Sequence, residues 1–245
     1  MKNSIVVIGG GESGVGAAFL ANKNGYDVFL SEFNTIEKKY KKILEDNNIN
    51  YEEGGHTLNK FFNAKEIVKS PGVSNNSEII IKIKSKNIPI ISEIEFAYRF
   101  TNSILIGVTG SNGKTTTCSL IYHILKNSGK SVGLAGNIGN SFSFLTAENS
   151  FDYIVLELSS FQLDDVNDFN LFISIIINIT PDHLERYEYD FQNYVNSKFK
   201  ITSNQSSTDY FIYNSDDDKI NSELNNRIIN STKISFSYKN NKEHN

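Results

Sequence analysis

The chain has 245 residues, a formal net charge of −4 and a hydrophobic content of 39%. That hydrophobic content can build a core and excludes a disordered chain. The acidic balance argues against a nucleic-acid partner, because nucleic-acid-binding domains usually carry a basic face. The single cysteine, Cys118, excludes a disulfide framework and a multi-cysteine zinc site. We expect it in the core, because its place is on the inner face of an expected helix. No apolar run reaches the ~18 residues of a membrane span, and the N-terminus lacks signal-peptide features. We therefore expect a cytoplasmic protein with no membrane partner.

The first part of the chain has the pattern of a small α/β domain. We expect strands at 5–8, 27–30, 49–51, 66–69 and 88–91, and helices at 14–24, 36–45 and 76–86. The continuous apolar run Ile5–Ile8 is typical of a parallel sheet that is covered on both faces. The S-P-G turn at Ser70–Gly72 ends the fourth strand. We predict a Rossmann-like domain over residues 1–92 and a linker over residues 93–102.

The second part, residues 103–245, also alternates strands with helices. We expect strands at 103–108, 131–135, 152–158, 171–179, 210–213 and 233–236, and the longer helices at 114–127 and 191–202. This alternation predicts a mostly parallel sheet, so the fold class is α/β in both parts.

A first glycine motif, G-G-G-E-S-G-V-G at Gly9–Gly16, follows the first strand and opens a helix. Gly9, Gly11 and Gly14 fit the pattern G-x-G-x-x-G, in which the backbone approaches a pyrophosphate at a helix N-terminus. Glu32 lies where an acid would bind a ribose. Three readings stay open: NAD or FAD binding, a tight strand-to-helix turn without a ligand, and another diphosphate ligand such as a UDP-sugar.

A second motif, T-G-S-N-G-K-T-T at Thr109–Thr116, lies at the next strand-to-helix junction. The backbone amides of Gly110–Gly113 are suited to cradle phosphates, Lys114 to neutralise them, and the Thr115 hydroxyl to bind Mg²⁺. The usual phosphate loop has a glycine at the position of Val108, so this loop is a shorter variant. We favour a phosphate loop over an ordinary turn with an exposed lysine.

Polar residues also end the later strands. Glu157 comes at the end of an apolar strand, where it is either a magnesium ligand or an edge-exposed glutamate. Asp182, His183 and Arg186 follow the next long apolar strand. A lone histidine is more often a satisfied surface or core residue than a ligand, but this position at the same sheet edge favours a functional one. Nothing in composition or spacing distinguishes Lys198 from an ordinary solvated helical lysine.

These motifs together resemble the Mur ligase family, which builds peptidoglycan precursors and uses the short loop T-G-x-x-G-K-[ST]. The segments S-P-G-V (Ser70–Val73), G-N-I-G (Gly136–Gly139), E-L-S-S-F-Q-L (Glu157–Leu163) and N-I-T-P-D-H-L-E-R-Y (Asn178–Tyr187) are most similar to the members that add D-glutamate. The resemblance covers essentially the whole chain. It implies a Rossmann-like domain for a UDP-linked substrate and a P-loop-type central domain for ATP.

The implied activity is ATP- and Mg²⁺-dependent ligation of D-glutamate to UDP-N-acetylmuramoyl-L-alanine through an acyl phosphate, with release of ADP, by a cytoplasmic monomer. The implied ATP-binding residues are Gly110, Ser111, Asn112, Gly113, Lys114, Thr115 and Thr116. The implied substrate-binding residues are Gly11, Glu12, Ser13, Gly14, Gly72, Asn137, Ser159, Gln162 and His183. Thr115, Glu157, His183 and Lys198 would hold magnesium, and Lys114, Glu157, His183 and Lys198 would be catalytic. Lys198 matches a lysine that is carbamylated in the family.

Two departures from the family pattern bear on function. The segment Leu30–Phe33 lacks the polar residues that often contact the uracil side in the family, so the sequence does not identify the residues that contact the base. The family has three domains, and we expect the chain to end within or near the end of the second, without the C-terminal domain that carries the D-glutamate site. We therefore expect substrate and nucleotide binding without full ligase activity. The alternatives are a non-catalytic UDP-sugar- or nucleotide-binding protein of the same fold, a nicotinamide-dependent dehydrogenase, and a P-loop GTPase or kinase.

Overall fold

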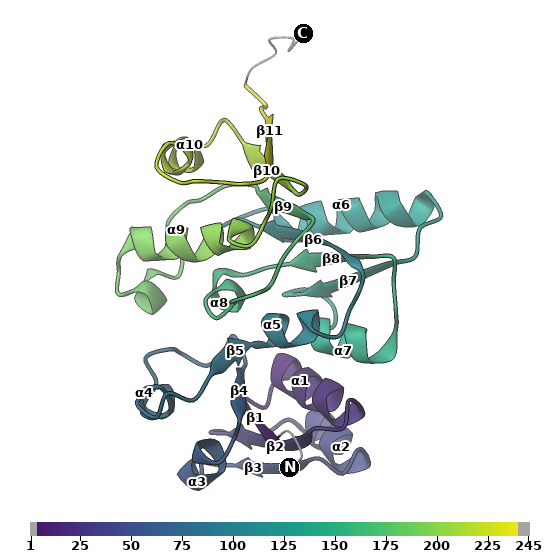
Figure 1. Cartoon of the computed structure of the whole chain (residues 1–245), viewed down its shortest axis with the longest axis vertical. Helices are drawn as coiled ribbons and strands as arrows, with labels where there is room; N and C mark the ends of the chain where they lie inside the picture. Colours follow the sequence, from purple (N-terminus) through teal and green to yellow (C-terminus); the bar gives the residue numbers. More distant parts are fainter. Residues whose placement is uncertain (1–3, 240–245) are drawn as a thin grey trace. The chain divides into compact units, whose positions relative to one another are not determined.

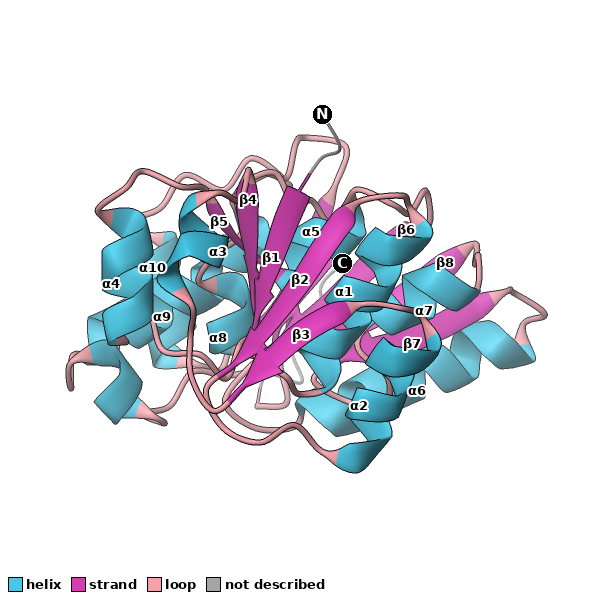
Figure 2. Cartoon of the chain, turned by 90° about the horizontal axis from the view of Figure 1, so that it is seen from below, coloured by secondary structure: helices cyan, strands magenta, loops and turns pink. Residues whose placement is uncertain are grey.

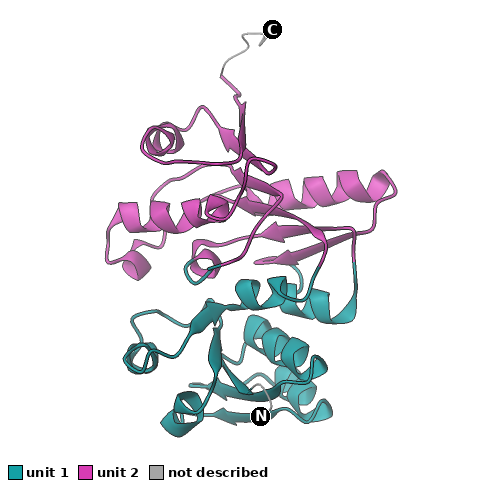
Figure 3. Ribbon diagram, in the orientation of Figure 1, with its two compact units in different colours: residues 1–101, 139–150, 164–167 teal, residues 102–138, 151–163, 168–245 magenta. Residues whose placement is uncertain are grey.

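The computed structural model describes residues 4–239, and it divides into two compact units. Unit 1 comprises Met1–Thr101, Gly139–Ser150 and Asp164–Asn167, and unit 2 comprises Asn102–Ile138, Phe151–Leu163 and Asp168–Asn245 (Figure 3). The boundaries predicted at residues 92 and 103 stay a prediction. The segment expected as a linker carries the helix α5 (Glu93–Tyr98), and two later segments of the chain also belong to unit 1.

Unit 1 is built on a parallel sheet of five strands in the order β3-β2-β1-β4-β5 (Figure 1). Its elements are β1 (Ser4–Ile8), α1 (Glu12–Lys23), β2 (Asp27–Glu32), α2 (Lys38–Asp46), β3 (Asn50–Glu53), α3 (Leu58–Phe62), β4 (Glu66–Lys69), α4 (Glu78–Lys84), β5 (Ile90–Ser92), α5 and α7 (Phe142–Glu148). The predicted α/β class and parallel sheet are confirmed for this unit.

The apolar run of β1 is buried on both faces, as its sequence predicts. Val6 and Ile8 pack with Phe61 of α3, Ile67 of β4 and Ile80 of α4 in one core cluster. Because strand side chains alternate, Ile5 and Val7 point to the opposite face, which α1 covers with α2 beside it (Figure 2). Because β1 pairs in parallel with both β2 and β4, the carboxyl ends of these three strands lie at one edge of the sheet.

Unit 2 is built on a parallel sheet of six strands in the order β11-β10-β9-β6-β8-β7. Its elements are β6 (Ile104–Thr109), α6 (Lys114–Asn127), β7 (Val132–Gly136), β8 (Tyr153–Glu157), α8 (Ser160–Leu163), β9 (Ile173–Ile176), the 3₁₀ helix η1 (Leu184–Tyr187), α9 (Phe191–Phe199), the 3₁₀ helix η2 (Lys200–Thr202), β10 (Tyr210–Asn214), α10 (Asp218–Leu224) and β11 (Thr232–Phe236). Helix α6 packs its buried Cys118 on the sheet face that carries Ile106, Val108 and Val155, so the expected core position of the cysteine is confirmed.

Several expected elements have other bounds in the structure; the helix expected at 76–86, for example, is α4 over Glu78–Lys84 only. The strand expected at 171–179 is ordered as a strand only over β9, because the chain leaves the ladder after Ile176 to meet the glycine loop. The helix expected at 191–202 changes from α9 to the 3₁₀ helix η2 after Phe199. The helix expected to begin at residue 14 begins at Glu12. None of the described helices is long and apolar enough to cross a membrane.

Candidate functional site

The glycine loop of unit 2 joins β6 to α6. Gly113 is the N-cap of α6 and has φ +82°, a left-handed conformation that favours glycine. The first amides of an α-helix have no acceptor within the helix, and the helix dipole makes this end electropositive. The loop therefore ends in a site suited to an anion such as a phosphate.

Asn178, just beyond β9, fixes the first half of this loop. Its backbone oxygen accepts from Ser111 N at 3.0 Å, its Oδ1 accepts from Asn112 N at 2.9 Å, and its Nδ2 donates to Asn112 O at 3.0 Å. The Ser111 hydroxyl also turns inward and donates to Thr180 O at 2.8 Å. The amides of Ser111 and Asn112 are thus engaged, which leaves the amides from Gly113 onward as phosphate donors.

Two lysines bring positive charge to the loop. Lys114 Nζ donates to the carbonyls of Gly110 and Ser111, at 2.9 and 3.0 Å. Lys198 of α9 is buried, and its Nζ donates to the same Gly110 carbonyl at 2.8 Å and lies 4.6 Å from the centre of the Tyr194 ring. Burial and the nearby charge of Lys114 lower the pKa of Lys198 to about 7. The side chain therefore has an accessible neutral form near neutral pH.

Glu157 ends β8 beside the loop and is 2% exposed. Its Oε2 accepts from Thr115 Oγ1 at 2.8 Å, and its Oε1 accepts from Asn137 Nδ2 at 2.9 Å. The edge-exposed alternative for Glu157 is therefore wrong. A buried carboxylate next to the first threonine of a phosphate-type loop offers the hard oxygen atoms that Mg²⁺ prefers.

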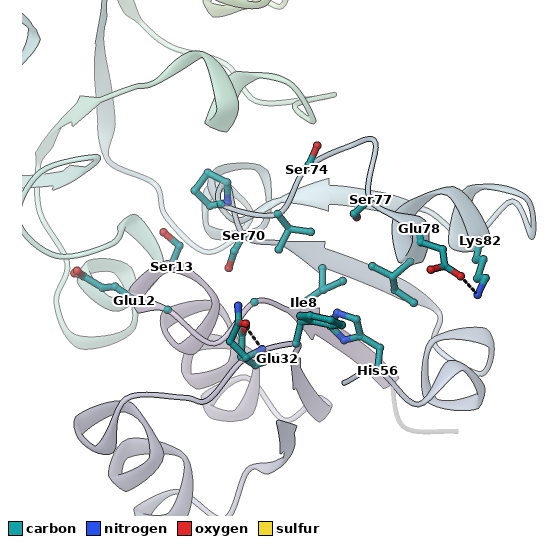
Figure 4. Close-up of a pocket in the computed structure, with 18 of the residues that line it drawn as sticks. Ile8, Glu12, Ser13, Glu32, His56, Ser70, Ser74, Ser77, Glu78 and Lys82 are labelled. Atoms are coloured by element: carbon teal, nitrogen blue, oxygen red, sulfur yellow. Dashed lines mark hydrogen bonds and ion pairs between the residues drawn. The ribbon is translucent and has the colours of Figure 1, made fainter. Parts of the chain in front are cut away.

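Unit 1 contains a pocket of about 860 Å³ at the carboxyl edge of its sheet (Figure 4). Gly11, Glu12, Ser13 and Gly72 line it, as the resemblance implies for the substrate. Gly14 has a packing role in the turn, because a Cβ at this position would lie 1.9 Å from Gly9 O. Only glycine allows α1 to pack so closely against the turn, which brings the N-terminus of α1 to the pocket.

The pocket also holds Ser70 and Ser77, whose hydroxyl groups are buried and lack a hydrogen-bond partner among the residues that the structure describes. A Cβ on Gly9 would lie 2.7 Å from Ser70 Oγ, so the hydroxyl reaches the glycine turn directly. Buried polar atoms usually have partners, so these two hydroxyls point to a polar ligand. Glu32, the expected ribose acid, also lines the pocket; its Oε2 accepts from Gly10 N at 2.6 Å and its Oε1 from Asn34 N at 2.7 Å.

Two parts of the chain match known protein families. Residues 108–245 match the family described as Mur ligase middle domain, and residues 4–79 match the family described as MurD N-terminal domain. The chain belongs to the Mur ligase family.

Curated members of the Mur ligase family include similar chains. A protein of Christiangramia forsetii named UDP-N-acetylmuramoylalanine--D-glutamate ligase is 50% identical over 237 residues, which cover 97% of this chain and 53% of that protein. One of the same name from Bacteroides fragilis is 54% identical over 220 residues, covering 90% of this chain and 50% of that protein. The chain thus spans about half the length of the curated relatives it matches.

Solved structures of Mur ligases share the fold. A UDP-N-acetylmuramate:L-alanyl-gamma-D-glutamyl-meso-diaminopimelate ligase from Neisseria meningitides has a TM-score of 0.66 at 18% identity, covering 95% of this chain and 78% of that one. A UDP-N-acetylmuramate-alanine ligase from Thermotoga maritima has a TM-score of 0.58 at 24% identity, covering 97% of this chain and 53% of that one. These similarities support the α/β fold of the Mur ligase chain.

The residues that the Mur ligase resemblance singles out do not all gather at the loop. His183 is 56% exposed in its side chain, lies 3.7 Å from both Asp182 and Glu185, and packs its ring on Phe161 at 5.4 Å. Ser159 donates from its amide and its hydroxyl to Gln162 Oε1, at 3.0 Å each, in a local turn. Within residues 4–239 no three His, Cys, Asp or Glu side chains form a metal-binding group. The roles of these residues stay predictions.

Sequence reasoning missed Asn178, Ser77 and the hydroxyl of Ser70. Asn178 and Ser70 belong to the segments N-I-T-P-D-H and S-P-G-V, which resemble the family, but neither residue was assigned a role. The signal that could have found them is position, since Ser70 directly follows one expected strand and Asn178 lies near the end of another, and the carboxyl ends of parallel strands face the ligand edge of the sheet. Their pairing with the glycine turns depends on contacts distant in sequence and is visible only in the fold.

Proposed function

We propose that the chain provides the donor-substrate and ATP sites of a ligase that joins D-glutamate to UDP-N-acetylmuramoyl-L-alanine in peptidoglycan precursor synthesis. The observation that carries this proposal is the hydrogen bond of 2.8 Å between Thr115 Oγ1 and the buried Glu157 Oε2, at the N-terminus of α6. It joins the hydroxyl of a phosphate loop to a carboxylate at the end of the adjacent strand. The names of the two curated relatives support the choice of substrates.

The ATP phosphates bind at the start of α6 in this proposal. The amides from Gly113 to Thr116 and the ammonium of Lys114 hold the β- and γ-phosphates. Thr115 and Glu157 fit a magnesium ion together with phosphate oxygens, because Mg²⁺ is usually bound by one or two carboxylates plus substrate phosphates. When bound, the ion would screen the repulsion between ATP and the attacking carboxylate.

The donor substrate binds with its diphosphate at the turn Gly9–Gly14 and the N-terminus of α1. Gly11 and Ser13 face it from one side, and the hydroxyl of Ser70, which has no hydrogen-bond partner within residues 4–239, donates from the other. The alanyl carboxylate attacks the γ-phosphate to form an acyl phosphate, and the amine of D-glutamate then displaces phosphate to form the amide. Lys114 lowers the barrier by neutralising charge that builds on the transferred group.

Lys198 takes part as a carbamate. Its neutral amine adds to carbon dioxide with loss of one proton, which replaces a cation with an anionic oxygen ligand suited to Mg²⁺. The pKa of about 7 makes the neutral amine available. Carbon-13 NMR of the chain under labelled bicarbonate is expected to show one carbamate carbon, which Lys198→Met removes and Lys200→Met leaves. A spectrum of Lys198→Met that retains the signal would refute this role.

Calorimetric titration with UDP-N-acetylmuramoyl-L-alanine tests the main proposal, with and without Mg²⁺ and a non-hydrolysable ATP analogue. We expect saturable binding of both ligands, with Lys114→Met losing the nucleotide and keeping the donor substrate. Lys130→Met, at an exposed position after α6, is the control. Binding of NADH instead of the UDP-linked substrate would refute the proposal and favour a dehydrogenase. Binding of both ligands without D-glutamate-dependent ADP release at normal rates is the outcome expected of this chain, and release at normal rates would overturn the expectation that it lacks full ligase activity.

A further inference from the structure

The unit 1 pocket contains two aromatic residues that the proposed function has not used. Phe33, directly after β2, is 66% exposed, and His56, after β3, lines the same pocket with its ring centre 5.8 Å from that of Phe33. Figure 4 shows Glu12 and Ser13 at one end of the pocket, Glu78 and Lys82 at the other, and His56 between them, beyond Glu32. An aromatic ring left exposed on a pocket wall gains binding energy when a flat ligand covers it.

A hydrogen-bond relay fixes the tautomer of His56. Ser31 Oγ donates to Glu52 Oε1 at 2.7 Å and lies 2.7 Å from His56 Nδ1. Burial raises the pKa of the Glu52 carboxyl, but hydrogen bonds from Thr57 and Ser31 outweigh it and leave that pKa below its usual value, so Glu52 is an ionised acceptor. Ser31 has only one proton to give, and it goes to Glu52, so His56 Nδ1 must carry a proton and donate to Ser31 Oγ.

The same relay sets the chemistry of the other ring nitrogen. Burial is the largest influence on the pKa of His56 and lowers it, and the facing carboxylates of Glu52 and Glu32 only partly offset this. The ring is therefore neutral at neutral pH. With its proton on Nδ1, it presents Nε2 as a lone-pair acceptor. This nitrogen accepts a hydrogen bond from a ligand N–H and repels a ligand acceptor.

The order of the strands lines up the parts of a nucleotide. The sheet runs β3-β2-β1, so the turn after β1, the acid Glu32 at the end of β2 and His56 after β3 follow one another along the carboxyl edge. Neighbouring strands lie about 4.8 Å apart, so the first and last of these positions are separated by ~10 Å. A diphosphate at the first position and a ribose near Glu32 direct the base to Phe33 and His56.

We propose that Phe33 and His56 read the base of a uridine nucleotide: the Phe33 ring stacks on the pyrimidine, and His56 Nε2 accepts a hydrogen bond from its N3–H. Uracil carries a donor at N3, whereas cytosine carries an acceptor there, so the fixed tautomer selects uracil. The inference rests on the proposed function, since it names the residues that select the base of the UDP-linked donor. It also supplies the base contacts that the sequence of Leu30–Phe33 had left open.

Titration calorimetry of the chain with UDP and CDP tests the base selection. The wild-type chain is expected to prefer UDP by about tenfold or more, the effect of one hydrogen bond made or left unpaired. His56→Phe keeps the ring and removes both nitrogens, so UDP affinity falls about tenfold and the preference over CDP disappears. His123→Phe, at an exposed position on α6, is the matched control and changes neither affinity.

The stacking partner gives a different signature. Phe33→Leu is expected to weaken UDP and CDP alike by about tenfold, because stacking does not depend on base identity, whereas Phe33→Tyr retains the affinity for both. Nitrogen-15 NMR of the histidine rings, with His56 assigned from His56→Phe, is expected to show Nδ1 protonated and the Nε2 signal shifting on UDP addition.

The outcomes separate this inference from the function on which it rests. A wild-type chain that binds neither UDP nor UDP-N-acetylmuramoyl-L-alanine would overturn both. A chain that binds UDP, with His56→Phe keeping the wild-type ratio of UDP to CDP affinity, would overturn the inference alone. If His56→Phe does not fold, 3-methyluridine diphosphate on the wild-type chain tests the same bond. We expect it to bind about tenfold more weakly than UDP, and equal affinity would overturn the inference.

Discussion

Glu93 makes the stability of unit 1 dependent on pH. Glu93 is the first residue of α5 and is 1% exposed. Its Oε1 accepts a hydrogen bond from Ser143 N, at the start of α7, at 2.6 Å. Burial raises the pKa of Glu93 from its ordinary value of 4.5 to about 7, and the negative Glu12 adds to the rise. The folded chain therefore holds this proton up to a higher pH than the unfolded chain does.

The sign and size of the effect follow from this difference. Below pH 4.5 both states carry the proton and Glu93 adds no pH dependence. Between pH 4.5 and about 7 the folded state binds more protons, so the free energy of unfolding falls as pH rises. The total loss by pH 8 is about 3 kcal/mol. Glu93→Gln removes the titrating group, so we expect the variant to gain about 3 kcal/mol relative to wild type between pH 4.5 and 8.

Urea unfolding of wild type and variant at matched pH values measures this difference, followed by circular dichroism because the chain has no tryptophan. Hydrogen exchange of peptides from α5 and α7 assigns the transition to unit 1. Glu148→Gln, at an exposed position on α7, is the control and is expected to leave the pH dependence unchanged. A stability difference between wild type and Glu93→Gln that stays constant from pH 4.5 to 8 would refute the reasoning.

Three further predictions follow from burial and backbone geometry. Burial and the nearby Glu157 raise the pKa of the Cys118 thiol to about 12, so the native chain should resist a thiol reagent at pH 8 and react fully in urea; fast native labelling would contradict this. Gly14→Ala should lower the free energy of unfolding by about 3 kcal/mol, because its Cβ meets Gly9 O. Gly11→Ala, with open space around the Cβ, should change it by less than about 0.5 kcal/mol in the same melts. Val108→Gly should cost about 3 kcal/mol without improving nucleotide affinity, and tighter binding in calorimetry would contradict this.

The sequence predicted the two parallel sheets because their strands are long apolar runs separated by turn signals and helical patterns. It missed the short helices α3, α5, α8 and α10, which run for 4 to 7 residues and are too short to show a helical period. It also could not assign 139–150 to unit 1. That assignment depends on Glu12 and Glu93, whose carboxylates accept the amides of Ser141 and Ser143, more than 45 residues away along the chain.

The candidate site was predictable where chemistry follows strand ends and unpredictable where it depends on pairing across the fold. Thr115 follows β6 and Glu157 ends β8, and these strands are neighbours in a parallel sheet, so the meeting of the two side chains follows from the order of the motifs. Lys198 lies on a helix with no pattern of its own, and only its burial against the Gly110 carbonyl sets it apart. The relay from Glu52 to His56 likewise requires β2 and β3 to be adjacent and in register.

The missing glycine of the phosphate loop has a physical reason in β6. Val108 is fully buried, pairs with Glu157 of β8 and Ile175 of β9, and packs in the core beneath α6. A residue still inside the sheet must be apolar and needs no left-handed conformation, so valine suits this position better than glycine. The loop begins only at Gly110. Asn178 accepts hydrogen bonds from the amides of Ser111 and Asn112, and these bonds fix the first half of the loop without a longer glycine-rich turn. The amides at the start of α6 then remain for the phosphates.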